Sequence, residues 1–358
     1  MKLQGAIIGL GNIAFGSHLP AYLHHGDAVE IVSGCDRSLE NQEHFLKLVP
    51  RAKTYTDFHD LFAKHPLDFV SICTPPNSHY EIIREAVKHE VAVLCEKPLC
   101  TGIGELQQII KLLREAGLPF MPCHQYRYAS QWKKLTSMID QGMIGRVLHA
   151  HFEVFRKEPN PGNRHWRSNW RTLREKSGGG IIQDHGTHLF YLAESLLGKP
   201  VKIGARLNCF LHDHDGLEDS AWISSVHENG VAKFDITWAS FQRRINYRIL
   251  GDLGEILLNE KEICYIDKNG KSSIIEMDSF SGNSLHKDWF DTLIGLFLNQ
   301  VREKRPDMDW LKEAAGGFIF SQIAYLSSRE EREIETQAIF QDPDYPDYSL
   351  SLYKFLFS

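Results

Sequence analysis

The chain has 358 residues, more than a single domain usually contains, and this length predicts two domains. Its 40 basic and 46 acidic side chains give a formal charge of -6, which argues against a dedicated nucleic-acid-binding protein, because such proteins carry a basic surplus. No apolar run approaches the roughly 18 residues that span a bilayer, and residues 1–9 are not typical of a signal peptide, so we expect a cytoplasmic protein without a membrane partner. The seven cysteines include no CxxC pair, which indicates free thiols rather than a zinc site.

The first part of the chain alternates short β-branched runs with helical periodicity, which is typical of a parallel sheet with crossover helices. We expect strands near 3–9, 29–35, 67–74, 91–95 and 119–123, and helices near 12–24, 39–48, 57–64, 78–89 and 104–116. Ser78 and Glu81 form a capping-box pattern at the start of one helix, and Gly117 is placed to end another. This pattern predicts a Rossmann domain over residues 1–123.

After residue 124 the pattern changes to a mainly antiparallel sheet with a few helices. The expected helices are 129–142, 181–197, 284–303 and 310–328, and the expected strands are 146–154, 202–211, 219–228, 231–239, 244–250, 254–258, 261–266 and 271–276. The fold class is therefore α/β, with a Rossmann domain followed by an α/β domain with a large open sheet over 124–340. A Pro/Asp/Tyr-rich tail follows over 341–358.

A glycine turn follows the first expected strand and opens the first helix. Gly9 and Gly11 allow the backbone to approach a pyrophosphate, and Asn12 and Ile13 begin the helix whose N-terminus attracts anions. Asp36 ends the second strand about 25 residues later, where an acid accepts hydrogen bonds from ribose hydroxyls and repels a 2'-phosphate. The pattern favours NAD over NADP.

Two further features bear on this site. Arg37 could stack on adenine, neutralise the 2'-phosphate of NADP, or face solvent, and the sequence leaves these readings open. Thr74, Pro75 and Asn77 end a strand at the carboxyl edge of the sheet, where open α/β folds bind ligands, although prolines there could also be simple turn residues. We expect this loop to line a cofactor.

Lys97 and His188 are the candidate reactive groups. Lys97 lies between Glu96 and Pro98 directly after the fourth expected strand, so it should project from the sheet edge, although a solvated lysine is the usual alternative. His188 follows a triple glycine at 178–180 and lies four residues after Asp184, which places both on one face of an α-helix. An imidazole titrates near neutral pH and suits a general acid/base, whereas a histidine simply packed against Asp184 is the alternative.

Together these motifs resemble the glucose-fructose oxidoreductase, inositol dehydrogenase and rhizopine-catabolism family (Gfo/Idh/MocA). The helix that contains Glu313-Ala314-Ala315 is similar to the family's returning C-terminal helix, so the resemblance covers most of the chain. The resemblance implies that Lys97, Asp184 and His188 occupy the catalytic positions, and that the open sheet builds a homodimer or homotetramer. Residues expected to line the cofactor also include His79, Glu96, Lys97 and Gln125, and Gln125 stands where asparagine is usual in the family.

The expected substrate is a sugar, inositol, polyol or nucleotide sugar. Aromatic rings stack on sugars and guanidinium groups bind anions, so we expect contacts from Tyr126, Arg127, Trp166, Trp170 and Arg171. The surrounding basic and aromatic residues, Arg156, Arg164, His165, Arg167 and Arg174, could equally form a solvated loop or a subunit contact.

Two histidine-containing runs could suggest a metal. The run His212, Asp213, His214, Asp215 with Glu218 and Asp219 has suitable ligand types but ends in Asp-Gly, which is ordinary turn chemistry, and His149 and His151 share a strand face. We expect both to be structural and assign no metal.

The expected reaction is hydride transfer between a nicotinamide and a hydroxyl or keto carbon. His188 acts as the base, Lys97 as the cation that polarises the hydroxyl, and Asp184 as the group that orients His188 or holds a neighbouring hydroxyl. The alternatives are an NAD-dependent glycoside hydrolase that oxidises its substrate transiently, and a non-catalytic dinucleotide-binding sensor.

Overall fold

The computed structural model describes residues 1–159, 169–212, 216–277 and 287–357, which form two compact units. Within these ranges the first unit contains residues 1–128, Asn169 and residues 287–314, and the second contains the remainder. The division falls inside one long helix, α10 (Met308–Glu330), between Ala314 and Ala315. None of the described helices is both long enough and apolar enough to cross a bilayer.

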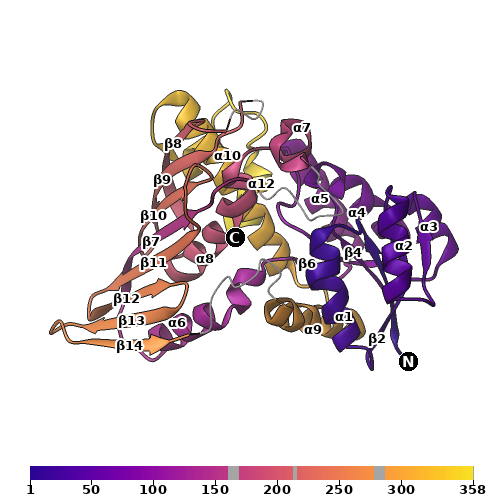
Figure 1. Ribbon diagram of the computed structural model, residues 1–358. Helices are drawn as coiled ribbons and strands as arrows, with labels where there is room; N and C mark the ends of the chain where they lie inside the picture. The colour runs from indigo at the N-terminus through magenta and orange to yellow at the C-terminus, as the bar shows by residue number, and fades with distance from the viewer. Residues whose placement is uncertain (160–168, 213–215, 278–286, 358) are drawn as a thin grey trace. The chain divides into compact units, whose positions relative to one another are not determined.

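The first unit is built on a six-stranded parallel sheet of order β3-β2-β1-β4-β5-β6 (Figure 1). Its strands are β1 (Leu3–Ile8), β2 (Val29–Cys35), β3 (Lys53–Tyr55), β4 (Phe69–Ile72), β5 (Ala92–Cys95) and β6 (Phe120–Pro122). The expected Rossmann fold is thus confirmed. The sequence missed β3, because this three-residue edge strand is too short to show any periodicity.

Helices connect and cover these strands. They are η1 (Ala14–His18), α1 (Leu19–His24), α2 (Leu39–Leu48), α3 (Phe58–Lys64), η2 (Pro76–Ser78), α4 (His79–Lys88), α5 (Ile103–Ala116), η3 (Gln125–Tyr128) and α9 (Lys287–Glu303). Gly117 ends α5 with φ +59° and its N–H donates to the Leu113 carbonyl, as expected. The capping box is wrong: the Ser78 hydroxyl donates to Thr74 Oγ1 and the Pro75 carbonyl, and α4 begins only after η2.

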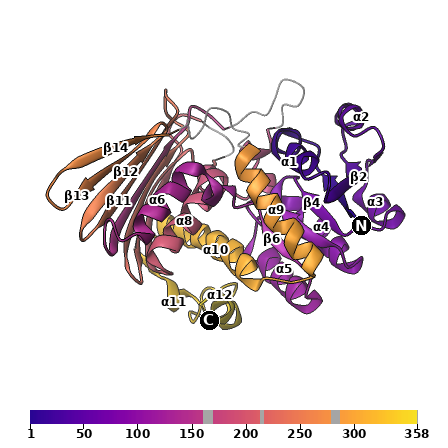
Figure 2. The ribbon, with the colours of Figure 1, turned by 90° about the horizontal axis from the view of Figure 1, so that it is seen from below.

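The late helix α9 belongs to the first unit. Phe290, Leu293, Ile294 and Phe297 are buried in one core with residues of β1, β2 and α1, and Figure 2 shows α9 lying beside α1. The expected range 124–340 for the second domain differs from this arrangement, because the apolar face of α9 completes the core of the Rossmann unit.

The second unit contains a nine-stranded sheet of order β14-β13-β12-β11-β7-β10-β9-β8-β15. The strands are β7 (Val147–Phe155), β8 (Pro200–Asn208), β9 (Ser220–His227), β10 (Gly230–Thr237), β11 (Arg244–Gly251), β12 (Gly254–Asn259), β13 (Glu262–Asp267), β14 (Ser272–Glu276) and β15 (Ile334–Glu335). Neighbouring strands in this sheet are antiparallel, except that β7 and β10 are parallel. The mainly antiparallel open sheet is confirmed.

Helices cover one face of this sheet (Figure 1). The described helices of this unit are α6 (Ser130–Asp140), η4 (Trp170–Thr172), α7 (Arg174–Ser177), η5 (Ile182–Gly186), α8 (Thr187–Leu197), α11 (Thr336–Ile339) and α12 (Leu350–Phe357), with the later part of α10. In β10 the side chains of Phe234 and Ile236 are buried while Val231 and Lys233 are exposed, as period-two alternation requires. The expected tail contains α12, whose Leu352, Phe355 and Leu356 are buried.

Candidate functional site

The carboxyl ends of four parallel strands meet at one edge of the Rossmann sheet. The register pairs Ile8 with Ile72, Ile72 with Cys95 and Cys95 with Pro122, so the segments that follow β1, β4, β5 and β6 leave the sheet side by side. The β1–β2 pairing adds the end of β2, because Ile8 lies opposite Cys35. The structure therefore brings the glycine turn, Asp36, the Thr74 loop and the Lys97 segment to the same edge, where open α/β sheets bind ligands.

The glycine turn is shaped by a close approach of two backbones. Gly9 has φ +90°, and a Cβ built there would lie 2.7 Å from the Cys73 carbonyl carbon and 2.8 Å from Thr74 N. Only glycine fits this position. Gly11 is buried at the start of the helix, and the side chains of Asn12 and Ile13 are partly exposed beside it.

Asp36 joins the end of β2 to this turn. Its Oδ2 accepts a hydrogen bond from Leu10 N at 2.7 Å, and its Oδ1 accepts one from Ser38 N at 2.7 Å. The partly exposed carboxylate is thereby fixed next to the glycine turn and keeps lone pairs for further donors. The neighbouring Arg37 is exposed.

The loop after β4 presents Thr74 and Pro75 as partly buried residues and Asn77 as an exposed one. His79 is fully buried, and its Nε2 lies 2.9 Å from the Thr74 carbonyl oxygen and its Nδ1 3.2 Å from the Leu99 carbonyl oxygen. Burial lowers the pKa of His79, although the two carbonyls oppose this shift. Because both ring nitrogens face backbone carbonyls, His79 ties the loop after β4 to the loop after β5.

Lys97 is partly exposed and follows the buried Glu96 at the end of β5. The Glu96 Oε1 lies 3.0 Å from the Nε2 of His18, a fully buried residue of η1, and Glu96 Oε2 accepts the Lys97 backbone N–H at 3.3 Å. Burial raises the pKa of Glu96, but the hydrogen bond and charge of His18 and the charge of Lys97 outweigh it, so the net pKa is lowered. Sequence reasoning missed His18, because a single histidine on a helix gives no signal of its partner.

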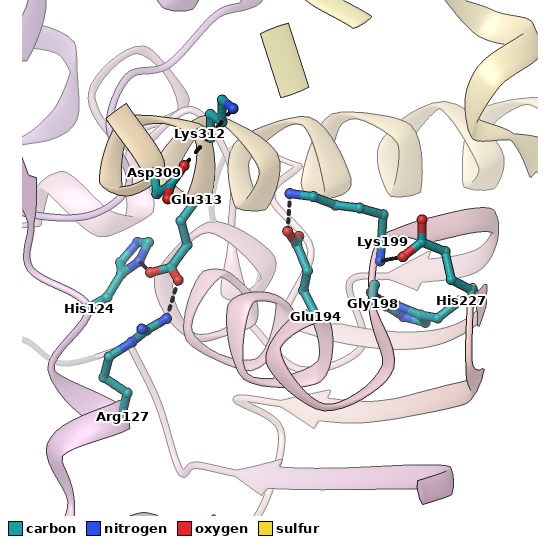
Figure 3. A network of polar contacts seen from close by, with 10 residues as sticks. His124, Arg127, Glu194, Gly198, Lys199, His227, Asp309, Lys312 and Glu313 are labelled. Atoms are coloured by element: carbon teal, nitrogen blue, oxygen red, sulfur yellow. Dashed lines mark hydrogen bonds and ion pairs between the residues drawn. The ribbon is translucent and has the colours of Figure 1, made fainter. Parts of the chain in front are cut away.

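A second carboxylate organises the segment after β6. Glu313 lies between His124 and Arg127 in Figure 3: His124 Nδ1 is 2.6 Å from Glu313 Oε1, and Arg127 Nη2 donates to Oε2. Burial raises the pKa of Glu313, but His124 and Arg127 together lower it by more than burial raises it, so the net pKa is below its ordinary value. Burial also lowers the pKa of His124 despite the neighbouring carboxylate. The Arg127 guanidinium lies 5.1 Å from the Trp310 ring centre.

The expected cofactor and substrate residues Gln125 and Tyr126 lie between these two anchored residues. Gln125 is only 6% exposed, and within the described ranges no donor reaches its buried Oε1. Tyr126 is buried with its ring edge against Trp289, at a centroid distance of 5.4 Å. A buried amide oxygen without a partner is unfavourable, because the loss of its hydration is not compensated.

In the second unit the triple glycine packs against Glu218 and Tyr325. A Cβ on Gly180 would lie 2.0 Å from the Glu218 carbonyl oxygen, and one on Gly179 would lie 2.0 Å from the Tyr325 hydroxyl. Glu218 Oε1 accepts hydrogen bonds from Gly180 N at 2.9 Å and from the Tyr325 hydroxyl at 2.7 Å. Burial raises the pKa of Glu218 even though these donors oppose the shift. The glycines thus allow the chain to enter η5 against a buried carboxyl group.

Asp184 and His188 lie on two different types of helix. Asp184 is on η5, a π-helix, and His188 is on α8, which begins at Thr187, so the single helix expected over 181–197 is wrong in its first part. The extra residue in a π-turn changes the angular spacing from which a shared α-helical face was inferred. Arg171 Nε donates to Asp184 Oδ1 at 3.2 Å, and Arg171 lies over the Trp170 ring at 4.3 Å.

The candidate base His188 is 3% exposed, and its Nδ1 lies 3.2 Å from the Tyr191 hydroxyl. Tyr191 is also buried, so this contact orients the imidazole within α8. Asp184 has a second neighbour in His185, whose Nε2 is 3.6 Å from Asp184 Oδ2. Together with the contact of Arg171 to Asp184 and the stacking of Arg171 on Trp170, the second unit holds Trp170, Arg171 and Asp184 as one cluster.

The remaining basic residues of the expected substrate segment divide into two groups. Trp166, Arg164, His165 and Arg167 lie outside the described residues. Arg156 is buried and its Nη1 donates to the carbonyls of Phe155 and Arg244, while Arg174 Nη2 donates to the Gly216 carbonyl. The described contacts of Arg156 and Arg174 are thus with the backbone.

The histidine-containing turn near residue 212 is organised by Asp219. Asp213, His214 and Asp215 lie outside the described residues, whereas Asp219 accepts hydrogen bonds from Phe210 N, Leu211 N and His212 N. Burial raises the pKa of Asp219, but these N–H groups lower it more. His151 Nε2 lies 2.7 Å from Asp235 Oδ2, a hydrogen-bond contact between the neighbouring strands β7 and β10, and His149 is partly buried on the same strand face.

The chain is similar in sequence and in fold to several known oxidoreductases. An uncharacterized oxidoreductase of Schizosaccharomyces pombe is 28% identical over 211 residues, which are 57% of this chain and only 54% of that protein. D-glucoside 3-dehydrogenase of Escherichia coli is 25% identical over 357 residues, which are 93% of this chain and 97% of that protein. The solved structure of levoglucosan dehydrogenase in complex with NADH has a TM-score of 0.81 at 16% identity, covering 94% of this chain and 99% of that one.

Two family models match consecutive parts of the chain. Residues 3–124 match the oxidoreductase family with an NAD-binding Rossmann fold, and residues 132–257 match the Gfo/Idh/MocA C-terminal domain. The match confirms the family, the Rossmann domain and the NAD cofactor that the motifs predicted. The chain belongs to the Gfo/Idh/MocA family of NAD-binding oxidoreductases.

Proposed function

We propose that this oxidoreductase transfers a hydride between NAD and a hydroxyl or keto carbon of a sugar or polyol. The observation that carries the proposal is that Asp36 follows β2 and Lys97 follows β5 at the same carboxyl edge of the parallel sheet, where Gly9 makes the turn after β1. An acid at the end of β2 suits a ribose, and an ammonium group at the same edge suits a polarised hydroxyl oxygen. The similarity to D-glucoside 3-dehydrogenase over nearly the whole chain supports a sugar as substrate.

The residues present fit a dinucleotide. The Gly9 turn leaves no room for a side chain, which lets the backbone of Gly9 and Gly11 approach a pyrophosphate at the start of the helix. Asp36 offers a fixed carboxylate for ribose hydroxyls, and the buried Gln125 Oε1 offers an acceptor for an amide N–H. We assign the remaining lining to Asn12, Ile13, Thr74, Pro75, Asn77, Glu96 and Lys97, with His79 acting from beneath through the Thr74 carbonyl.

The charge at Asp36 favours NAD over NADP, because a carboxylate repels a 2'-phosphate. The exposed Arg37 next to it is the residue through which NADP could be accepted instead.

The chain's own groups supply the proton chemistry, and bound NAD supplies the hydride acceptor. His188 takes the hydroxyl proton during oxidation, with its ring held by the Tyr191 hydroxyl. Lys97 stabilises the negative charge that develops on the oxygen. Asp184, held by Arg171, orients His188 or binds a neighbouring hydroxyl, and in reduction the proton moves in the opposite direction.

We assign substrate contacts to Tyr126, Arg127, Trp166, Trp170 and Arg171, which offer aromatic faces and guanidinium groups to a sugar, an inositol or a nucleotide sugar. The protein acts as a homodimer or homotetramer through the open sheet face, which exposes Trp222, Val226 and Val231. We place it in the cytoplasm, in agreement with its seven free cysteines.

The test is a screen of the purified chain against sugars, inositols and nucleotide sugars with NAD and with NADP, followed by nicotinamide absorbance. Lys97→Ala and His188→Ala should each lower turnover at least about 100-fold, the usual scale of acid/base catalysis, with NAD affinity largely kept. Lys199→Ala is the control, because Lys199 pairs with Glu194 and has no assigned role (Figure 3 draws the pair).

The outcomes separate the alternatives. Wild-type turnover in the Lys97 or His188 variant would remove that residue's assigned role. Glycosidic cleavage without net NADH would identify a hydrolase, and NAD binding without turnover of any compound in the panel would identify a sensor.

A further inference from the structure

His18 is a buried polar residue that the proposed chemistry does not use. It ends the π-helix η1 that follows the glycine turn, and its side chain is fully buried. Its Nε2 lies 3.0 Å from Glu96 Oε1, its Nδ1 lies 3.1 Å from Ser71 Oγ, and its ring centre lies 4.8 Å from that of Phe290. Contacts to β4, to the end of β5 and to α9 therefore fix the imidazole from three sides.

The hydrogen bonds around His18 have one consistent direction. A carboxylate only accepts, so His18 Nε2 must carry the proton that is shared with Glu96. The Tyr22 hydroxyl lies 2.7 Å from Ser71 Oγ, and it can donate to Ser71 while the Ser71 hydroxyl donates to His18 Nδ1. The donors and acceptors from Tyr22 to Glu96 can thus all be matched, with the hydrogen positions assigned from this network.

Glu96 connects His18 to the backbone of Lys97. One carboxylate oxygen receives His18 and the other accepts the Lys97 backbone N–H at 3.3 Å. The side chain of Glu96 therefore braces the backbone from which Lys97 extends, and His18 braces Glu96. Without a donor, an ionised carboxylate in this buried place is strongly unfavourable, so it would turn away or take up a proton.

We propose that His18 is a positioning residue that holds the Glu96 carboxylate and so fixes the backbone of Lys97 relative to the helix of the glycine turn. This inference rests on the proposed catalytic role of Lys97. In this proposal the η1 helix connects two parts of the site. Its first residues follow the turn at Gly9, and its last residue, His18, contacts Glu96.

The matched substitutions are His18→Leu and His18→Gln. Leucine removes both polar contacts, whereas the amide of glutamine can donate from about the place of Nε2 and restore the bond to Glu96. We expect His18→Leu to lower kcat about 10- to 100-fold with little change in the KM for NAD, and His18→Gln to recover most of the loss. His227→Leu is the control for removing a buried histidine, because His227 pairs with the Gly198 carbonyl and the Ser225 hydroxyl and stacks on Phe320 in the second unit, and it has no assigned role (Figure 3 draws His227 and Gly198).

A readout independent of turnover is the protonation of Glu96. Burial raises the pKa of Glu96 and His18 is the largest opposing influence, so its removal should raise this pKa. The groups that face Glu96 are His18, Lys97, His79 and His124 with the thiols of Cys73, Cys95 and Cys123. In infrared titration, His18→Leu should show a protonated carboxyl band at a higher pH than the wild type, and Glu96→Gln should lack that band.

The results distinguish the two proposals. If Lys97→Ala keeps its turnover, the catalytic assignment is wrong whatever His18 does. If Lys97→Ala is inactive while His18→Leu keeps the wild-type kcat and carboxyl titration, the positioning role alone is wrong. If His18→Leu fails to fold, Ser71→Ala provides the test, since it removes the Nδ1 partner of His18, along with the partner of the Tyr22 hydroxyl, and leaves the contact between His18 and Glu96 in place. The proposal expects a smaller loss of kcat in the same direction, and an unchanged kcat overturns it.

Discussion

Substitution of Glu313 by glutamine tests how the segment after β6 is held. The change keeps the size of the side chain and removes the charge that receives His124 Nδ1 and Arg127 Nη2. Hydrogen bonds to charged groups contribute about 1.5–3 kcal/mol each, and breaking one partner of a buried pair costs about 3–5 kcal/mol. Arg127 remains 26% exposed and keeps its contact with Trp310, so we expect the lower end of this range, a loss of about 3 kcal/mol in the free energy of unfolding.

The pH dependence of this loss has a defined sign. The folded-state pKa of Glu313 lies below its ordinary value of 4.5, so the carboxylate stabilises the folded state above pH 4.5. This contribution disappears as the pH falls through the lowered folded-state pKa, because the protonated carboxyl then resembles the glutamine amide. The wild type and Glu313→Gln should therefore differ most at neutral pH and converge in acid.

The assay is urea denaturation of both proteins at neutral and acidic pH, with hydrogen exchange of residues 120–128 as the local readout. Glu333→Gln is the matched control, since Glu333 is 60% exposed and lies 3.9 Å from Lys202. Such a surface pair should change stability by less than about 0.5 kcal/mol. The reasoning is refuted if Glu313→Gln unfolds like this control at neutral pH, or if its deficit is the same in acid.

Two further substitutions probe the cofactor edge. Gly9→Ala should destabilise the first unit by at least about 2 kcal/mol in urea denaturation and weaken NAD binding in calorimetry, because a Cβ at φ +90° meets the Cys73 backbone. Gly102→Ala is its control, with no atom within 4 Å of the added Cβ, and equal effects of the two would contradict the argument. Asp36→Ser should shift the ratio of NAD to NADP affinity toward NADP by about tenfold or more, which is about 1.4 kcal/mol. An unchanged ratio would show that the carboxylate does not select the cofactor.

Local patterns in the sequence were sufficient for the Rossmann sheet and its turns. The Gly9 turn, Asp36 and Lys97 each follow a buried strand, and parallel pairing alone brings strand ends to one edge, so no long-range information was needed. Gly117 was similarly predictable, because a left-handed C-cap depends only on neighbouring residues.

Features that depend on distant partners could not be predicted. Glu313 lies 189 residues from His124, and His18 lies 78 residues from Glu96, so neither pair leaves a local pattern. Glu218 illustrates the same limit, because in sequence it stands in a possible metal turn, whereas in the structure it receives the N–H of Gly180. The packing of α9 in the first unit also depends on an apolar face whose partner the sequence does not indicate.

Local competition explains the two errors in helix starts. Ser78 donates to Thr74 and Pro75 instead of capping α4, because the Pro75-Pro76 turn places these acceptors within reach. The π-helix η5 begins where Glu218 accepts the N–H groups of Gly180 and Ile182, a contact that α-helical periodicity does not include.

The most direct measurement of the central claim follows the hydride itself. A sugar or polyol that turns over in the screen is prepared with deuterium at its reacting carbon and incubated with NAD and the wild-type chain or Lys97→Ala. The account predicts that mass spectrometry finds the deuterium in the reduced nicotinamide with the wild type, at a rate at least about 100-fold lower with Lys97→Ala. Product formation with the deuterium absent from the nicotinamide would contradict it.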